Sequence, residues 1–340
     1  MNSIVLSASS DTDEFQPGRW LRNRHLQSML ASTSWRRARV RARAQPMVTG
    51  ARELLLDCGA GVRLQCFIST PETQALRGVA PVVLLHGWEG SAESLYVLSL
   101  AQLLFAQGVE VVRLNLRDHG ETHHLNRELF HSCRLPEVIG AIQALQSGHF
   151  GGRALQLAGF SLGGNFMLRV AAQARTAGLE LAQVIAVSPV LDPAETLAAL
   201  QRGFPGYELY FVRKWLRSLR RKQQVWPDVY DFAAIARMRD LKSMTAELVA
   251  KYTDFPGLED YLNGYAITGN RLAQLEVPSS IITSLDDPII PAGALARLAR
   301  PAALAVSLTR YGGHCGFFAR LAGPTWLERR MVAQLAGVAP

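Results

Sequence analysis

Residues 155–165 read LQLAGFSLGGN and decide the fold. The apolar run at 155–160 predicts a strand and a helix-like pattern begins at Phe166, so Ser161 stands at a sharp turn between them. The spacing G-x-S-x-G has a mechanical reason, because glycines on either side of the serine let strand and helix pack closely. Such a turn raises the hydroxyl above the sheet and aims helix N-terminal N–H groups at a reacting oxygen. Ser161 is therefore a candidate nucleophile.

Further apolar runs lie on both sides of this turn, at residues 81–85, 109–116 and 184–187. Runs of this kind predict strands buried on both faces. Because strands and helices alternate from 82 to 188, we expect an α/β fold with a mostly parallel central sheet and helices on both faces. The other expected elements are a hairpin at 53–69, helices at 91–107 and 166–177, strands at 281–284 and 303–308, and a closing helix at 317–335.

The alternation stops in the middle of the chain, which predicts an inserted domain. Residues 194–275 contain no convincing buried strand and carry aromatic and basic helical segments, so we interpret them as a helical cap. The α/β core then comprises residues 46–193 and 276–340, and residues 1–45 form an N-terminal arm. Cap aromatics such as Tyr207, Phe211 and Trp215 are either core residues or the wall of a substrate pocket.

An acid and a base follow Ser161 in the order Ser, Asp, His, each after a late strand. His314, in the stretch GGHCG, is the candidate base that takes the serine proton and returns it to the leaving group. An aspartate must hold the imidazole in the right tautomer. We choose Asp287, because the pattern D-x-apolar-apolar-P is usual after an acid on such a turn; Asp286 is the alternative.

The oxyanion needs two N–H groups already aimed at the developing charge. One is expected from Leu162, directly after the serine, and the other from Trp88 in the loop after the strand at 81–85. In this interpretation His86 holds the loop and carries no proton.

Composition limits the class of protein. The 340 residues are 49% hydrophobic and 19% charged, which is typical of a globular chain. No apolar run has the length of a membrane span, the N-terminus lacks a signal-peptide pattern, and the four cysteines show no C-x-x-C spacing, so a reducing cytoplasm is expected. The net charge of +8 includes the basic run Arg36–Arg43. This run indicates either contact with an anionic surface or, as we favour, arginines exposed to solvent.

Other chemistries fit the sequence less well. His119, His123, His124 and His131 invite a metal site, but no carboxylate-plus-third-histidine pattern completes a ligand set, so no metal is expected. Cys315 beside His314 is interpreted as a small buried residue and not as a nucleophile. Neither a P-loop nor a dinucleotide-binding glycine motif is present.

Five short motifs together resemble the α/β-hydrolases, and more closely their YheT-like branch of esterases and acyltransferases. They are NxHLQ at 23–27, HGxEGS at 86–91, GFSLGGN at 159–165, DDP at 286–288 and YGGHxGF at 311–317. The resemblance implies the α/β-hydrolase fold and a Ser-Asp-His enzyme for carboxylic esters that needs no cofactor. The chain departs from the family pattern at Arg117–His124 and at Phe130–Ser132, which concerns substrate preference and not the triad.

We therefore expect a serine esterase that acts through an acyl-enzyme on short- to medium-chain acyl esters, including monoacylglycerol-like lipids. The alternatives are an acyltransferase that passes the acyl group to an alcohol, and a non-catalytic binder on the same fold. The expected partner is a small-molecule ester, with no nucleic acid, because no nucleic-acid-binding motif accompanies the charge, and with at most a peripheral contact to a lipid surface.

Overall fold

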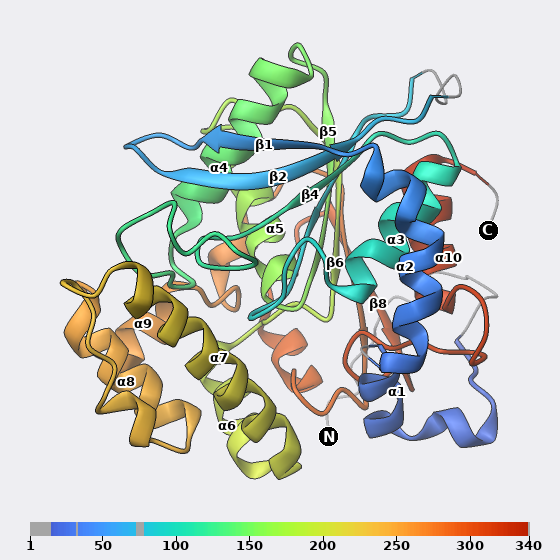
Figure 1. Cartoon of the computed structure of the whole chain (residues 1–340). Helices are drawn as coiled ribbons and strands as arrows, with labels where there is room; N and C mark the ends of the chain where they lie inside the picture. Colours follow the sequence, from blue (N-terminus) through green and yellow to red (C-terminus); the bar gives the residue numbers. More distant parts are fainter. Residues whose placement is uncertain (1–14, 32, 73–77, 339–340) are drawn as a thin grey trace.

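The computed structural model describes residues 15–31, 33–72 and 78–338. Their strands form an eight-stranded sheet in the order β1-β2-β4-β3-β5-β6-β7-β8 (Figure 1). β2 is antiparallel to β1 and β4, and the remaining neighbours are parallel, which confirms the expected α/β class. The strands are β1 (Arg52–Asp57), β2 (Arg63–Ser69), β3 (Val82–Leu85), β4 (Val111–Leu114), β5 (Leu155–Phe160), β6 (Leu181–Val187), β7 (Ser279–Ser284) and β8 (Leu304–Thr309).

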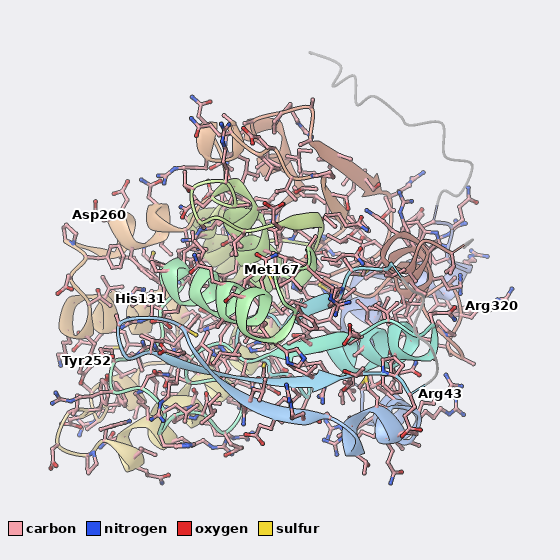
Figure 2. All side chains as sticks on the ribbon, turned by 90° about the horizontal axis from the view of Figure 1, so that it is seen from above. Arg43, His131, Met167, Tyr252, Asp260 and Arg320 are labelled. Atoms are coloured by element: carbon pink, nitrogen blue, oxygen red, sulfur yellow. The ribbon has the colours of Figure 1, made fainter. Side chains whose placement is uncertain are left out.

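Helices cover both faces of the sheet (Figure 1). Successive strand residues point to opposite faces, so Val82 and Leu84 belong to a core with α2, α3 and α10, whereas Val83 and Leu85 belong to a core with α4 and α5. Figure 2 shows Met167 of α5 near the middle of the molecule, where it is fully buried. These helices are α2 (Ser34–Thr49), α3 (Leu95–Ala106), α4 (Leu135–Ala144), α5 (Leu162–Ala172) and α10 (Trp326–Ala336), with the short η2 (Leu145–His149) and η5 (Ala292–Arg297).

The segment expected to form a cap is helical, and it lies to one side of the sheet (Figure 1). Its first helix begins where Asp192 accepts the N–H groups of Ala194 and Glu195, a regular N-cap. The cap helices are α6 (Pro193–Arg202), α7 (Pro205–Val225), α8 (Leu241–Tyr252) and α9 (Leu258–Gly264), with the short η3 (Ile235–Arg237) and η4 (Asn270–Leu272).

Three expected helix starts were wrong. α5 begins at Leu162 and not at Phe166, because its glycines serve as helix residues that approach neighbouring strands. α3 begins at Leu95 and not at residue 91, since residues 91–94 form a turn closed by the Ser94 N–H and the Ser91 carbonyl. The closing helix begins at Trp326 and not at 317, where Thr325 and Glu328 form a capping box.

The N-terminal arm is part of the packed structure, and its expected end at residue 45 was wrong. After η1 (Arg19–Arg22) and α1 (Arg24–Leu30), helix α2 continues through Pro46 to Thr49 and packs against α3. Phe15 is buried against the rings of Phe317 and Trp326. Residues 1–14 of the expected arm lie outside the described residues.

Candidate active site

Ser161 lies in a strained turn between β5 and α5. β5 ends at Phe160, α5 begins at Leu162, and Ser161 has φ 54° and ψ −119°. For a non-glycine residue this backbone conformation costs on the order of 1–3 kcal/mol and persists only where surrounding contacts impose it. One such contact is the Ser161 N–H, which donates to the Val187 carbonyl at 2.8 Å. The turn therefore has the strand–turn–helix geometry that the sequence predicts.

Close backbone packing explains the glycines around Ser161. A Cβ atom at Gly159 would lie 2.4 Å from the carbonyl carbon of Gly163, and one at Gly163 would lie 2.4 Å from the carbonyl oxygen of His86. A Cβ atom at Gly87 would lie 3.2 Å from Cβ of Ser161. Any side chain at Gly159 or Gly163 would push α5 away from the sheet. The loop after β3 is thereby held directly against the serine.

His314 and Asp287 form a hydrogen-bonded pair. Nδ1 of His314 lies 2.8 Å from Oδ2 of Asp287, while Oδ1 of Asp287 accepts the N–H groups of Ile289 and Ile290 at 2.8 and 2.9 Å. Burial alone would lower the pKa of His314, but the charge of Asp287 and the hydrogen bond outweigh it, and the pKa lies well above its usual value. The carboxylate is thus fixed by backbone donors and holds the imidazole by Nδ1.

Asp286 has a different partner. Its Oδ1 accepts the N–H of Gly313 at 2.9 Å, one residue before His314, while its buried Oδ2 has no hydrogen-bond partner among the described residues. Asp286 therefore contacts the backbone of the histidine loop, and Asp287 contacts the ring.

The serine and the histidine loop meet at the end of β6. The Val187 carbonyl that accepts the Ser161 N–H also lies 4.0 Å from Sγ of Cys315. In the described part of the chain, Oγ of Ser161 forms no hydrogen bond with His314. Hydrogen bonds between such groups are often long without substrate and tighten when it binds.

The loop after β3 leaves one N–H group unused. The Gly87 N–H donates to the hydroxyl of Tyr96 at 3.0 Å, and the Glu89 N–H donates to Nε2 of His119 at 3.1 Å. Between them, the Trp88 N–H bonds to no group of the described residues. Leu162 is the first residue of α5, and its N–H likewise has no acceptor within the described ranges. Both N–H groups that the sequence predicts as oxyanion donors are therefore without an acceptor among the described residues.

The geometry agrees with the comparison to known families. A family model described as "Alpha/beta hydrolase family" matches residues 82–322, more than two thirds of the chain. The protein belongs to the alpha/beta hydrolase family.

Solved structures similar to this hydrolase share its fold at low sequence identity. A 2,6-dihydroxy-pseudo-oxynicotine hydrolase is 18% identical with a TM-score of 0.56, over 89% of this chain and 73% of its own. An esterase of Pyrococcus furiosus is 12% identical with a TM-score of 0.54, over 85% and 92%. A bacterial membrane phospholipase A is 16% identical with a TM-score of 0.54, over 88% and 90%. At these identities the likeness is one of fold.

The cap helix α7 contacts the loop after β3 in this hydrolase. Nζ of Lys214 donates to the Glu89 carbonyl at 2.6 Å. The Trp88 ring stacks on Phe211 with centroids 5.3 Å apart and meets Trp215 edge-on at 5.0 Å. These three aromatic side chains are half-buried. The cap aromatics therefore form one wall above the loop that carries the Trp88 N–H.

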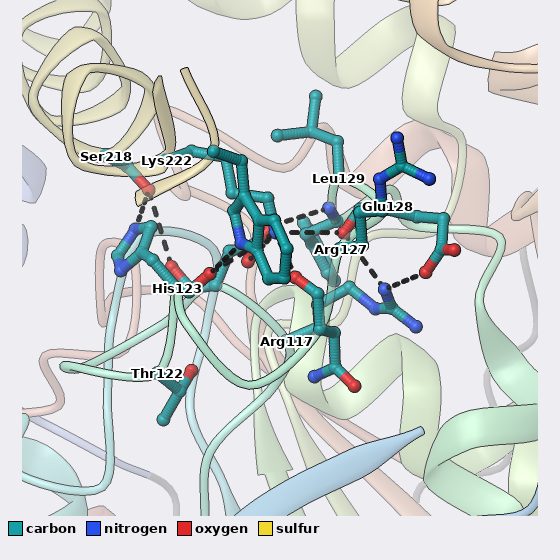
Figure 3. Close-up of polar contacts among 12 residues, drawn as sticks. Arg117, Thr122, His123, Arg127, Glu128, Leu129, Ser218 and Lys222 are labelled. Atoms are coloured by element: carbon teal, nitrogen blue, oxygen red, sulfur yellow. Dashed lines mark hydrogen bonds and ion pairs between the residues drawn. The ribbon is translucent and has the colours of Figure 1, made fainter. Parts of the chain in front are cut away.

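Lys222, near the C-terminal end of α7, binds the loop after β4 (Figure 3). Its buried ammonium donates to Oδ1 of Asp118 at 2.8 Å and to the carbonyls of Asn126 and Glu128 at 2.6 and 3.1 Å. Removing one member of a buried ion pair leaves the other charge uncompensated, which typically costs several kcal/mol. This cluster anchors the cap to the core.

Two histidines of the group considered for a metal site, His119 and His123, and the neighbouring His86 have structural partners. In both His86 and His119, Nδ1 donates to a backbone carbonyl 2.7 Å away and Nε2 accepts a backbone N–H. This pattern requires neutral rings, and burial indeed lowers the pKa of His119 to about 4 and that of His86 well below its usual value. His123 contacts Ser218 of α7 at 2.9 Å. Within the described ranges, no three His, Cys, Asp or Glu side chains are grouped so as to hold a metal ion.

Helix α1 supports the histidine loop, a role that the NxHLQ motif did not reveal. Asn23 caps α1, and the buried Gln27 side chain donates to the Phe318 carbonyl at 3.0 Å and accepts the Phe318 N–H at 2.7 Å. Oγ of Ser28 accepts the His314 N–H at 2.8 Å. The arm thus fixes the backbone on both sides of the candidate base.

None of the helices in the described ranges is both long enough and apolar enough to cross a membrane.

Proposed function

We propose that this hydrolase is a serine carboxylic-ester hydrolase with Ser161 as nucleophile, His314 as base and Asp287 as acid. The observation that carries the proposal is the hydrogen bond between His314 and Asp287 beside a strained serine turn that has two unused N–H groups. That set supplies the three roles acyl transfer needs: a nucleophile, an oriented base and an oxyanion site.

In the acylation step, Oγ of Ser161 attacks the ester carbonyl carbon and its proton passes to Nε2 of His314. The carbonyl oxygen becomes an oxyanion that accepts the N–H groups of Trp88 and Leu162. The bond to the alcohol oxygen then breaks, and the alcohol leaves with the proton from His314. Asp287 stabilises the imidazolium throughout.

In the deacylation step, water gives its proton to His314 and attacks the acyl carbon. The bond to Oγ breaks, the acid leaves and Ser161 regains its proton. The chain's own residues supply every group that these steps need.

We further propose short- to medium-chain acyl esters, including monoacylglycerol-like lipids, as substrates, and a place in the YheT-like branch. The half-buried aromatic wall of Trp88, Phe211 and Trp215 supports an apolar acyl group, since aromatic side chains line most sites for apolar ligands. Hydrolysis rates for a series of p-nitrophenyl esters of increasing acyl length test this; a preference for charged acyl groups would contradict it.

The decisive variant is Ser161→Ala, matched with Cys315→Ala at the neighbouring thiol. Ser161→Ala should lower kcat for p-nitrophenyl butyrate by at least about 10³-fold, and Cys315→Ala should retain most activity. A fluorophosphonate should label the wild type at Ser161. Wild-type rates in Ser161→Ala, or absence of labelling, would reject the proposal. Added alcohol in the same assay separates hydrolysis from acyl transfer by its products.

We also propose a reducing compartment, the cytoplasm, for this protein. All four cysteines are free thiols, and burial raises the pKa of Cys58 and Cys66 to about 12, which keeps them as thiols. Cell fractionation of the native protein checks this location.

A further inference from the structure

The most exposed large apolar side chain of the described residues lies at the start of the arm. Trp20 is 88% exposed, and Phe204 and Met29 nearby are 55% and 49% exposed. Together they border an open groove of about 530 Å³ between η1, α1 and the start of α7. Its lining residues are Arg19, Trp20, Asn23, His25, Leu26, Met29 and Phe204. Exposed apolar side chains gathered in this way are typical of sites that bind a protein, a ligand or a membrane.

The arm segment that lines this groove, which we call the arm groove, carries charge of one sign among its described residues. Residues 15–31 contain the exposed arginines Arg19, Arg22 and Arg24 and no acidic residue. Among the described residues, none of the three forms an ion pair. An exposed tryptophan flanked by arginines is the combination that anchors proteins at the interface of an anionic bilayer, where the indole lies among the head groups.

The basic run Arg36–Arg43, noted in the sequence, is less suited to binding an anionic bilayer. Arg36 is buried, pairs with Glu328 and donates to Ser99 at 2.9 Å. It therefore belongs to the interior contact between α2 and its neighbours, so the run does not form one free basic face.

The arm groove lies next to the candidate active site. Its back wall is α1, and the same helix accepts the His314 N–H through Ser28 at 2.8 Å. Its cap side is Phe204, and one turn further along α7 the Tyr207 hydroxyl lies 3.0 Å from Nδ1 of His25. A lipid surface that binds the arm groove would therefore lie against the contact between the arm and the cap. That contact borders the candidate active site.

We propose that the arm groove docks this protein on the surface of an anionic phospholipid bilayer, with Trp20 in the head-group region and Arg19 and Arg24 on lipid phosphates. Docking does not depend on the proposed ester hydrolysis, because it uses no residue of the catalytic set. It explains why an apolar groove and arginines without an ion-pair partner among the described residues are placed on the same short segment.

Co-sedimentation with phosphatidylcholine vesicles, with and without about one third phosphatidylglycerol, tests the proposal in full-length protein carrying Ser161→Ala. We expect binding only to the anionic vesicles. Trp20→Ala should weaken it about tenfold, and Arg19→Gln with Arg24→Gln about 10- to 30-fold. Because Trp20 is exposed, Trp20→Ala made in the protein with Ser161 intact should fold normally and hydrolyse a water-soluble ester at the wild-type rate.

The matched controls are Leu55→Ser, at an exposed leucine on β1, and Arg237→Gln with Arg239→Gln, at exposed arginines of the cap. They should bind vesicles like the parent. Equal binding to neutral vesicles, no binding to either kind, or equal losses in the control variants would overturn the proposal. Binding by the Ser161→Ala protein together with failed ester hydrolysis in the wild type would reject the enzyme and keep the docking surface.

Discussion

Asp286 and Asp287 are identical side chains one residue apart, yet they bind different parts of the histidine loop. Asp287→Asn should lower kcat by about 10⁴-fold, because a neutral amide stabilises the wrong tautomer of His314 and cannot stabilise the imidazolium. Asp286→Asn keeps a carbonyl oxygen for the Gly313 N–H, so it should lower kcat less than about tenfold. Steady-state kinetics on a p-nitrophenyl ester compares the two. Equal losses, or a larger loss for Asp286→Asn, would reverse the assignment.

The pH profile tests the same pair. A protonated His314 cannot accept the serine proton, and its pKa lies well above the ordinary 6.5 because the charge of Asp287 outweighs burial. We therefore expect kcat/KM to rise with pH through a midpoint above 6.5. Asp287→Asn removes the largest influence that raises the pKa of His314 and leaves burial, which lowers it, in place, so the midpoint of the residual activity should move to lower pH. An unchanged midpoint would mean that another group limits the profile.

At the scale of single residues, the sequence predicted the candidate site where the chemistry permits only a few residue types. Ser161, Asp287 and His314 stand in a chain order and next to turn residues that few other arrangements share. The supporting residues carry no such signal. Ser28 and Tyr96 reach the site from separate helices through contacts that only the folded chain brings together, and a lone serine or tyrosine is too common to single out.

At the scale of elements, α7 contacts the core on both sides of the site. Tyr207 near its start reaches His25, Lys214 in its middle reaches Glu89, and Lys222 near its end reaches Asp118. The sequence predicted helices in this segment because it contains no convincing buried strand and carries aromatic and basic helical segments, but the contacts depend on tertiary packing. The misplaced start of α5 has a related cause, because glycine usually indicates a turn and here permits close helix packing.

Lys214 offers a test of this coupling. Lys214→Met removes the donor to the Glu89 carbonyl and should loosen the Trp88 N–H, which lowers kcat about tenfold with little change in KM, since the oxyanion forms only in the transition state. Lys214→Arg keeps a donor and should recover most of the rate. Lys242→Met, at an exposed lysine on α8, is the matched control. A loss confined to KM, or no rescue by arginine, would reject the positioning role.

At the scale of the whole molecule, the mostly parallel sheet with helices on both faces follows from the strand and helix alternation that the sequence displays. The position of the arm does not, because it rests on side chains such as Phe15 that enter the core from a segment of polar composition. The buried histidines are a second property of the whole fold. Their neutral rings hold backbone groups in separate loops, so protonation of several rings should act on global stability.

Acid should therefore destabilise this protein well above the usual carboxylate range. Burial lowers the folded-state pKa of His119 and His123 to about 4 and that of His131 to about 3, so between pH 6.5 and 4 the unfolded chain binds more protons. The free energy of unfolding should fall as pH falls through that window, by about 1.4 kcal/mol per pH unit for each fully buried ring. His314 has the opposite sign, since its raised pKa adds stability below 6.5 that is lost as pH rises through the folded value.

Urea unfolding at about pH 7 and about pH 5 measures this dependence. His119→Gln should reduce the slope by about one proton, because glutamine keeps an acceptor for the Glu89 N–H but does not titrate. His124→Gln, at an exposed histidine, is the matched control and should keep the parent slope. A free energy of unfolding that falls as steeply with pH in His119→Gln as in the parent protein would show that His119 binds its proton equally well in the folded and the unfolded chain, and the hydrogen-bond directions assigned to its ring would then be wrong.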